Sequence, residues 1–161
     1  MRRRLVLMRH AKSDWSSVGQ GDHERPLNAR GRKSAPAMAR VLALGGFVPD
    51  AVCSSDSART TETWERMALE WASEVVPQWV PALYLAEPRT ILEVATTLPA
   101  EARCGLLLGH NPGMSEAASR LAGFDIELRT ADAAVFEADS ADWAPQAWRL
   151  LVVLRSRDAG E

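Results

Sequence analysis

Cysteine and histidine are scarce in this 161-residue chain, which has two cysteines and three histidines. Cys53 and Cys104 both lie in apolar, strand-like segments, and their spacing matches no zinc motif. Because unpaired cysteines are usually buried, we expect reduced thiols in the core of a cytoplasmic protein. The sequence has no cluster of histidines, carboxylates or cysteines at ligand spacing, so it predicts neither a metal nor another cofactor.

Long apolar runs and a strong net charge are also missing. Only four apolar residues separate the basic start, Arg2 to Arg4, from Arg9, which is too few for the apolar core of a signal peptide. No other apolar stretch approaches the length of a membrane span. The formal net charge of −2 gives no electrostatic reason to expect nucleic acid or an anionic membrane as a partner.

What the chain does have is an alternation of strand-like and helix-like segments. There is no repeat and no good linker, so we expect one domain over residues 1–161, with a frayed tail at 156–161. The alternation predicts an α/β fold, a three-layer α/β/α sandwich with a mostly parallel sheet whose last two strands pair antiparallel. The expected strands are 4–8, 51–53, 104–108, 133–137 and 148–154, with an extended segment at 74–81; the expected helices are 30–45, one capped at 54–57 that runs to about 73, 88–98 and 114–122.

The first strand ends in a cation and an imidazole side by side, Arg9 and His10. Ligands of open α/β sheets bind outside the carboxyl ends of the strands, which would place His10 at the mouth of a crevice. The arginine offers planar, forked donors that suit phosphate or carboxylate. Taken alone, however, the pair fits an ordinary surface loop better than a site.

Two further strand ends carry charged or reactive side chains. The second strand ends at Ser54 and is followed by Arg59 in the first turn of a helix, and a later strand runs into Gly109–Gly113, which contains His110. Singly, Arg59 could be a solvated helix residue and His110 part of a plain turn. Parallel strands bring these ends to one edge of the sheet, where two arginines, two histidines and free helix amides would bind a tetrahedral dianion.

Four sequence blocks follow one another along the chain: Arg9–Trp15, Arg25–Ala35, Ser54–Thr63 and Gly109–Gly113. With these blocks in this order, the chain resembles the histidine phosphatase superfamily, in the branch of SixA-like phosphohistidine phosphatases. The resemblance covers most of the chain and implies a phosphoglycerate mutase-like fold. Ala11 stands where the wider superfamily usually has glycine, and alanine is common in this branch.

The resemblance implies that His10 is the nucleophile of a metal-independent phosphatase. A neutral imidazole attacks phosphorus in line, and two nearby guanidiniums disfavour its protonated form. They also stabilise charge on the equatorial oxygens in the transition state. The implied phosphate-binding residues are Arg9, Arg59 and His110, which complete the catalytic pocket, together with Ser16 and Asn111.

The sequence leaves the general acid open. Glu87, just before Pro88 at a helix start, is the best candidate, but its carboxylate would equally stabilise that helix N-terminus. A phosphohistidine substrate needs less help from an acid. The chain has no long insertion to cover a small molecule, so we expect a shallow site that acts on phosphohistidine of a signalling or phosphotransfer protein. The alternatives are a phosphatase of small phosphate esters and a catalytically inactive phosphate-binding module.

The remaining histidine and the tryptophans carry weaker expectations. His23 lies in a charged stretch, 20–25, that predicts a solvated loop. Trp15, in the first block, is expected to line the site. Trp64 and Trp71 are seven residues apart and should share a helix face.

Overall fold

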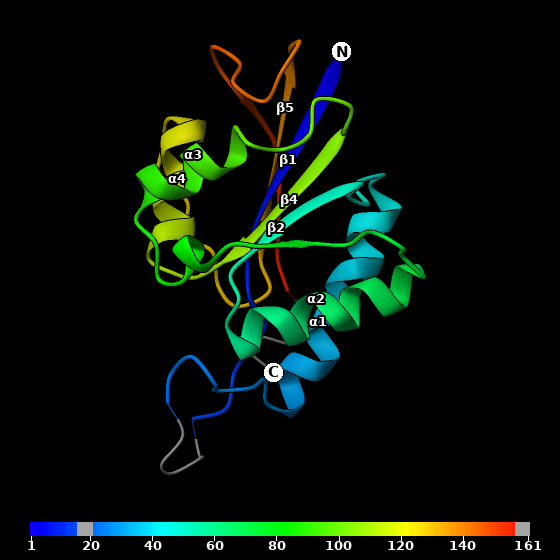
Figure 1. The fold of residues 1–161 in the computed structure, drawn as a ribbon, viewed down its shortest axis with the longest axis vertical. Coiled ribbons are helices and arrows are strands. Elements are labelled where there is room, and N and C mark those ends of the chain that lie inside the picture. Colours follow the sequence, from blue (N-terminus) through cyan, green and yellow to red (C-terminus); the bar gives the residue numbers. More distant parts are fainter. Residues whose placement is uncertain (16–20, 157–161) are drawn as a thin grey trace.

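A six-stranded sheet with the strand order β3-β2-β4-β1-β5-β6 lies at the centre of the molecule (Figure 1). The structure is a computed structural model, and it describes residues 1–15 and 21–156. The strands are β1 (Arg2–Arg9), β2 (Ala51–Ser54), β3 (Gln78–Trp79), β4 (Cys104–Gly109), β5 (Ala133–Asp139) and β6 (Arg149–Leu154).

The sheet is mixed, as the sequence predicts. β1, β4, β2 and β3 are parallel, whereas β5 is antiparallel to β1, and β6 is antiparallel to β5. In the register of β1 with β4, Arg9 stands opposite Gly109, and the N–H of His10 donates to the Gly109 carbonyl at 3.1 Å. The strand ends that carry His10 and His110 are therefore held side by side.

Helices cover both faces of the sheet and complete the predicted three layers (Figure 1). Leu5 and Leu7 of β1 pack in the core that includes α3 (Pro88–Ala95) and α4 (Gly113–Ala122). Val6 and Met8 pack in the core that includes α1 (Ala29–Leu44) and α2 (Ala58–Trp71). This division follows from the strand geometry, because successive side chains point to opposite faces.

Two capped helix starts fix the segments around the carboxyl edge of the sheet. The side chain of Asn28 accepts a hydrogen bond from the N–H of Gly31 at the start of α1, and that of Ser57 accepts one from Thr60 at the start of α2. Gly31 also allows a close approach, because a Cβ there would lie 2.1 Å from the carbonyl oxygen of Lys12. The first turn of α1 thus packs directly against the segment after β1.

Several boundaries differ from the predicted ones. The segment expected to be extended over 74–81 pairs only at β3, and a 3-10 helix, η1 (Pro81–Leu83), follows it. Pro77 and Pro81 lack the N–H groups that a longer ladder needs. The helix expected to reach residue 98 ends at Ala95. Ser156 is not frayed: it is buried, and its N–H donates to Asp132 Oδ1 at 2.7 Å. Residues 157–161 lie outside the described residues.

The structure also bears on the predictions made from composition. Cys53 and Cys104 are free and buried, as expected, and burial raises the pKa of the Cys104 thiol to about 12. Trp64 and Trp71 share a helix face, with ring centroids 6.1 Å apart. Among the helices that the structure describes, none is long and apolar enough to cross a membrane.

Candidate active site

The carboxyl edge of the parallel strands surrounds a cavity of about 370 Å³. Arg9 and His10 come from the end of β1, Arg59 from the first turn of α2, and His110 from the turn after β4. The structure therefore brings together the four residues that the strand ends predict to meet. The other residues that line the cavity are Lys12, Ser13, Trp15, Asp22, Arg25, Leu85, Asn111 and Thr130.

His10 is 5 % exposed, and the backbone that follows it orients its ring. Nδ1 lies 2.6 Å from the carbonyl oxygen of Ala11, which can only accept, so Nδ1 carries the proton and Nε2 keeps its lone pair. Arg59 donates from Nε to that lone pair at 3.3 Å. Burial, and then His110 and the two arginines nearby, hold the pKa of His10 well below its usual value. The imidazole is therefore neutral near pH 7 and suited to nucleophilic attack.

Asp22 holds the guanidinium of Arg59 in place. Arg59 donates from Nη2 to Asp22 Oδ2 at 3.0 Å and from Nη1 to the Asp22 carbonyl oxygen at 2.8 Å. The same carboxylate accepts hydrogen bonds from the Tyr84 hydroxyl and from Arg25 Nη2. The bond from Tyr84, together with the two arginines, keeps the pKa of Asp22 far below its usual value. Asp22 is thus an anion that ties the segment before α1 to α2 and to the segment after η1.

His110 lies beside His10, with ring centroids 5.3 Å apart. Its Nε2 is 2.8 Å from the hydroxyl oxygen of Ser55, and that oxygen already accepts a hydrogen bond from the N–H of Ser57. We assign the hydroxyl as the donor, because Nε2 then accepts its proton; in this tautomer Nδ1 is the protonated nitrogen of the ring. Burial, and then the charge of Arg59, lower the pKa of His110 to about 3. The ring is neutral, and its Nδ1–H is a hydrogen-bond donor.

Three buried side-chain nitrogens within the described part of the chain have no hydrogen-bond partner, and all three belong to residues that line this cavity. They are Arg9 Nε, Arg25 Nε and His110 Nδ1. Buried polar groups in proteins are nearly always paired. Orphaned donors around a single cavity therefore indicate a site that receives its acceptors from a ligand, and a phosphoryl group offers several oxygens.

Arg25 adds a third guanidinium to the cavity. It pairs with Asp22, donates to the hydroxyl of Ser13, and stacks on the indole of Trp15 with its Cζ 3.5 Å from the ring centroid. Trp15 is 79 % exposed and is among the lining residues, which agrees with its predicted place. Stacking against an aromatic face orients a guanidinium without neutralising it.

Asn111 lines the cavity, but protein contacts occupy both ends of its side chain. The amide nitrogen donates to the carbonyl of Leu128 at 2.7 Å, and the amide oxygen accepts from the N–H of Ser115 at 3.1 Å. These bonds fasten the turn after β4 to α4 and to the segment before β5. The structure thus shows a structural use of Asn111, and its predicted contact with phosphate stays a prediction. The other such contact, from Ser16, falls outside the described residues.

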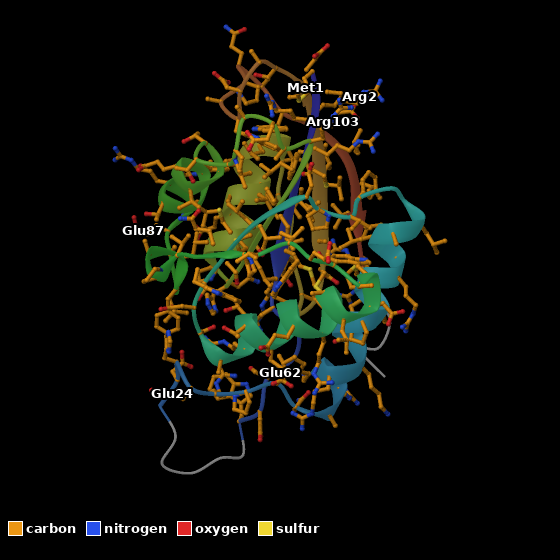
Figure 2. The ribbon with its side chains drawn as sticks, turned by 45° about the vertical axis from the view of Figure 1, so that its right-hand side comes forward. Met1, Arg2, Glu24, Glu62, Glu87 and Arg103 are labelled. Carbon is orange, nitrogen blue, oxygen red and sulfur yellow. The ribbon has the colours of Figure 1, made fainter. Side chains whose placement is uncertain are left out.

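Glu87, the candidate acid, is not among the residues that line the cavity. It is the exposed N-cap residue of α3, and Figure 2 shows it at the left margin of the molecule. Leu85, two residues earlier, lines the cavity instead, and its backbone is left-handed with a φ of 50°. The position favours the alternative role of Glu87, a carboxylate at a helix N-terminus.

Sequence reasoning missed the part played by residues 21–25. Their charge density predicts a solvated loop, yet Asp22 and Arg25 line the cavity and Asp22 binds Tyr84. His23 meets the expectation only in part: it is partly exposed and lies outside the lining, but it pairs with Asp56 at 3.0 Å, and its ring lies edge-on to Tyr84 with centroids 4.9 Å apart. One signal was available, since Asp22 and Arg25 are three residues apart and of opposite charge, and Arg25 opens the second family block.

The family model of the histidine phosphatase superfamily (branch 1) matches residues 5–79, which include Arg9, His10 and Arg59. An uncharacterized chloroplastic protein of Arabidopsis thaliana is 34% identical over 92% of this chain and 75% of its own length. The chain belongs to the histidine phosphatase superfamily. The matched stretch includes the end of the first strand, where Arg9 and His10 lie.

Two solved structures named for the phosphohistidine phosphatase SixA share this phosphoglycerate mutase-like fold. The one from Agrobacterium tumefaciens is 27% identical, covers 94% of this chain and 97% of its own, and has a TM-score of 0.80. The one from Nakamurella multipartitia is 27% identical, covers 98% of each chain, and has a TM-score of 0.82. Membership in the superfamily and these neighbours support a phosphatase.

Proposed function

We propose that this histidine phosphatase hydrolyses phosphohistidine on a signalling or phosphotransfer protein, through a phosphohistidine intermediate on His10. The orientation of the His10 ring carries the proposal. Its Nδ1 proton is held by the Ala11 carbonyl, and its Nε2 lone pair lies 3.3 Å from Arg59 Nε, among donors that lack acceptors. A neutral, aligned nitrogen beside fixed cations suits in-line attack on phosphorus.

The reaction proceeds in two transfers. First, the lone pair of His10 Nε2 forms a bond to phosphorus while the P–N bond to the substrate imidazole breaks; the electron pair stays on that imidazole, which takes a proton from solvent. Arg9, Arg59 and the Nδ1–H of His110 stabilise charge on the phosphoryl oxygens. Water then attacks phosphorus and releases its proton to solvent. The electron pair of the N–P bond returns to His10 Nε2, and inorganic phosphate leaves.

The lack of a protonated carboxylic acid in the described lining supports phosphohistidine as the substrate class. Asp22 is the only carboxylate among the described lining residues, and its hydrogen bonds to Tyr84 and two arginines keep it ionised. An alkyl phosphate needs a proton on its poor leaving group. Phosphohistidine releases an imidazole, which solvent can protonate. A site without a protonated acid therefore discriminates against alkyl esters.

We propose that turnover requires no metal or other cofactor, because Arg9 and Arg59 supply the positive charge that a phosphoryl group needs. The residues that the structure describes contain no group of three or more histidines, cysteines or carboxylates that could hold a metal ion. A cytoplasmic location, and the expectation that neither nucleic acid nor a membrane is a partner, stay predictions from composition.

Rapid quenching with a ³²P-phosphohistidine protein tests the proposal. Wild type should trap acid-labile, alkali-stable label on the enzyme, and His10→Ala should trap none. His23→Ala, outside the cavity lining, is the matched control and should keep the label. The rate constants should be compared with those for a panel of aryl and alkyl phosphates.

Each outcome of this comparison separates the proposal from its alternatives. Label that appears equally on wild type and His10→Ala contradicts the nucleophile assignment. Faster turnover of alkyl phosphates than of phosphohistidine identifies an ester phosphatase. Tight phosphate binding without turnover of any substrate identifies an inactive phosphate-binding module.

A further inference from the structure

Leu85 adopts an unusual backbone conformation at the edge of the cavity. Its φ of 50° lies in the left-handed region, where the Cβ atom crowds the carbonyl oxygen. Asparagine tolerates this conformation better than leucine does. Among the described residues, the other non-glycine residues with positive φ are Ala72 and Ala131, and both are small. Leu85 is thus the bulky exception.

Anchors on both sides of Leu85 impose this turn. On one side, the hydroxyl of Tyr84 donates to Asp22, and the ring of Tyr84 lies edge-on to His110 with centroids 5.3 Å apart. On the other side, the carbonyl oxygen of Ala86 packs against Gly113, where a Cβ would lie 2.0 Å from that oxygen. The chain has one residue in which to turn between the two anchors.

The side chain of Leu85 gains little from folding. It is 54 % exposed and belongs to neither hydrophobic core, yet it lines the catalytic cavity together with the exposed Trp15. Two large apolar side chains therefore meet solvent beside a set of buried cations. A costly backbone conformation kept without burial points to a role in function. Apolar surface exposed beside a site points to contact with a partner.

We infer that Leu85 is a specificity-determining residue, which receives an apolar side chain adjacent to the phosphorylated histidine of a protein substrate. The inference rests on the proposed phosphohistidine phosphatase activity. A small hydroxylated phosphate ester would need polar partners at this position, and the leucine side chain has none. A protein substrate carries neighbours on both sides of the modified residue. The contact forms only when the phosphoryl group is seated at His10, so it discriminates between substrates.

Two phosphohistidine peptides test the inference, one with leucine on both sides of the modified histidine and one with serine on both sides. The measured quantity is the ratio of their kcat/KM values with the full-length protein. We expect wild type to favour the leucine peptide about 5- to 10-fold, the selectivity expected from partial burial of a leucine side chain.

Leu85→Asn is the informative variant, because asparagine keeps the branching of leucine, suits left-handed backbone and is polar. We expect its peptide ratio to fall to about 1 to 2, with a Tm equal to or above that of wild type. Leu69→Ala removes another exposed leucine, on α2 and outside the cavity lining, and should keep the wild-type ratio.

The outcomes distinguish this inference from the function on which it rests. A wild-type ratio near 1, or an unchanged ratio in Leu85→Asn, overturns the inference and leaves phosphohistidine hydrolysis in place. A Tm several degrees lower in Leu85→Asn assigns the leucine to packing and also overturns it. If neither peptide is hydrolysed while phosphate esters are, the proposed function fails and the inference fails with it.

Discussion

Arg59 directs its Nε–H at the Nε2 lone pair of His10 across 3.3 Å. Asp22 binds the two terminal nitrogens of the same guanidinium, so the group cannot swing away from the histidine. When a phosphoryl group approaches, its oxygens can replace the histidine as acceptor of that N–H. The lone pair is then released for attack while the guanidinium stays in place.

Acidification should destabilise the protein through its two buried imidazoles. His10 and His110 both have lowered pKa values, and burial is the largest cause in each. His110 and then the arginines lower the pKa of His10 further, and Arg59 lowers that of His110, which is about 3. From pH 6.5 down towards 3, the unfolded chain therefore binds protons that the folded chain does not. The free energy of unfolding should fall with decreasing pH, by up to about 1.4 kcal/mol per pH unit for each imidazole.

Urea unfolding at pH 4.5, 5.5 and 6.5 measures this slope. His110→Gln removes one of the two imidazoles, so its slope should be clearly shallower than that of wild type. Asp22 has a lowered pKa and would act in the same direction, but at pH values below this range. Equal slopes for the two proteins would show that His110 does not stay neutral when folded.

Asp22→Asn should separate catalysis from phosphate binding. The substitution keeps the bond from Arg59 Nη1 to the Asp22 backbone carbonyl but removes the charge that pairs with Nη2, so it loosens the guanidinium. Misplacement of a catalytic group costs on the order of 10- to 100-fold in kcat. It also removes an anion from the cavity, so the inhibition constant for inorganic phosphate should stay the same or fall.

Steady-state kinetics with phosphate as a competitive inhibitor give both quantities. Asp139→Asn is the matched control, since Asp139 ends β5, pairs with the N-terminal amine and lies outside the cavity lining. Its kcat and its inhibition constant should match those of wild type. An Asp22→Asn protein with unchanged kcat would mean that Arg59 is oriented without its carboxylate.

Glu87→Gln should slow all substrates alike, and only slightly. Glu87 lies at the exposed start of α3, where loss of its charge costs a few tenths to about 1 kcal/mol of stability. The measurement is kcat/KM for phosphohistidine, aryl phosphates and alkyl phosphates, with Glu93→Gln on the same helix for comparison. A loss that grows as the leaving group worsens would reinstate Glu87 as the general acid.

Chelation should leave turnover unchanged. Arg9 and Arg59 line the cavity with permanent positive charge, so the transition state needs no added cation. Activity after dialysis against EDTA should equal that of untreated protein, and added Mg²⁺ or Zn²⁺ should not raise it. Lost activity that a divalent ion restores would contradict the proposed chemistry.

Strand ends were the most predictable part of the site. Leu5 to Met8 form a short apolar run that stops at Arg9 and His10, and the run before Gly109 stops at a turn that contains His110, so both ends were visible in the sequence. Parallel pairing then dictates that His10 and His110 meet, whatever their separation along the chain. The layers of the fold were predictable for the same reason.

Contacts between loops were not predictable. The position of Asp22 depends on Tyr84, 62 residues away, and no periodicity links the two. Leucine has no preference for left-handed backbone, so nothing in the sequence showed that Leu85 rather than Glu87 would line the cavity. Pro77 and Pro81 indicate that the extended segment around β3 is limited in length. How far it pairs depends on which edge of β2 is free, and the sequence does not show that edge.

The contact of the Ala86 carbonyl with Gly113 has a kinetic consequence. Residues 84–86 are wedged against the first turn of α4, so this wall cannot hinge open without also moving the turn that bears His110. The enzyme is then preassembled at this wall, with no gate there to close over a bound product. The rate of phosphate release past residues 84–86 should therefore depend on the ion pairs between phosphate and the cavity. This rate should increase as ionic strength rises.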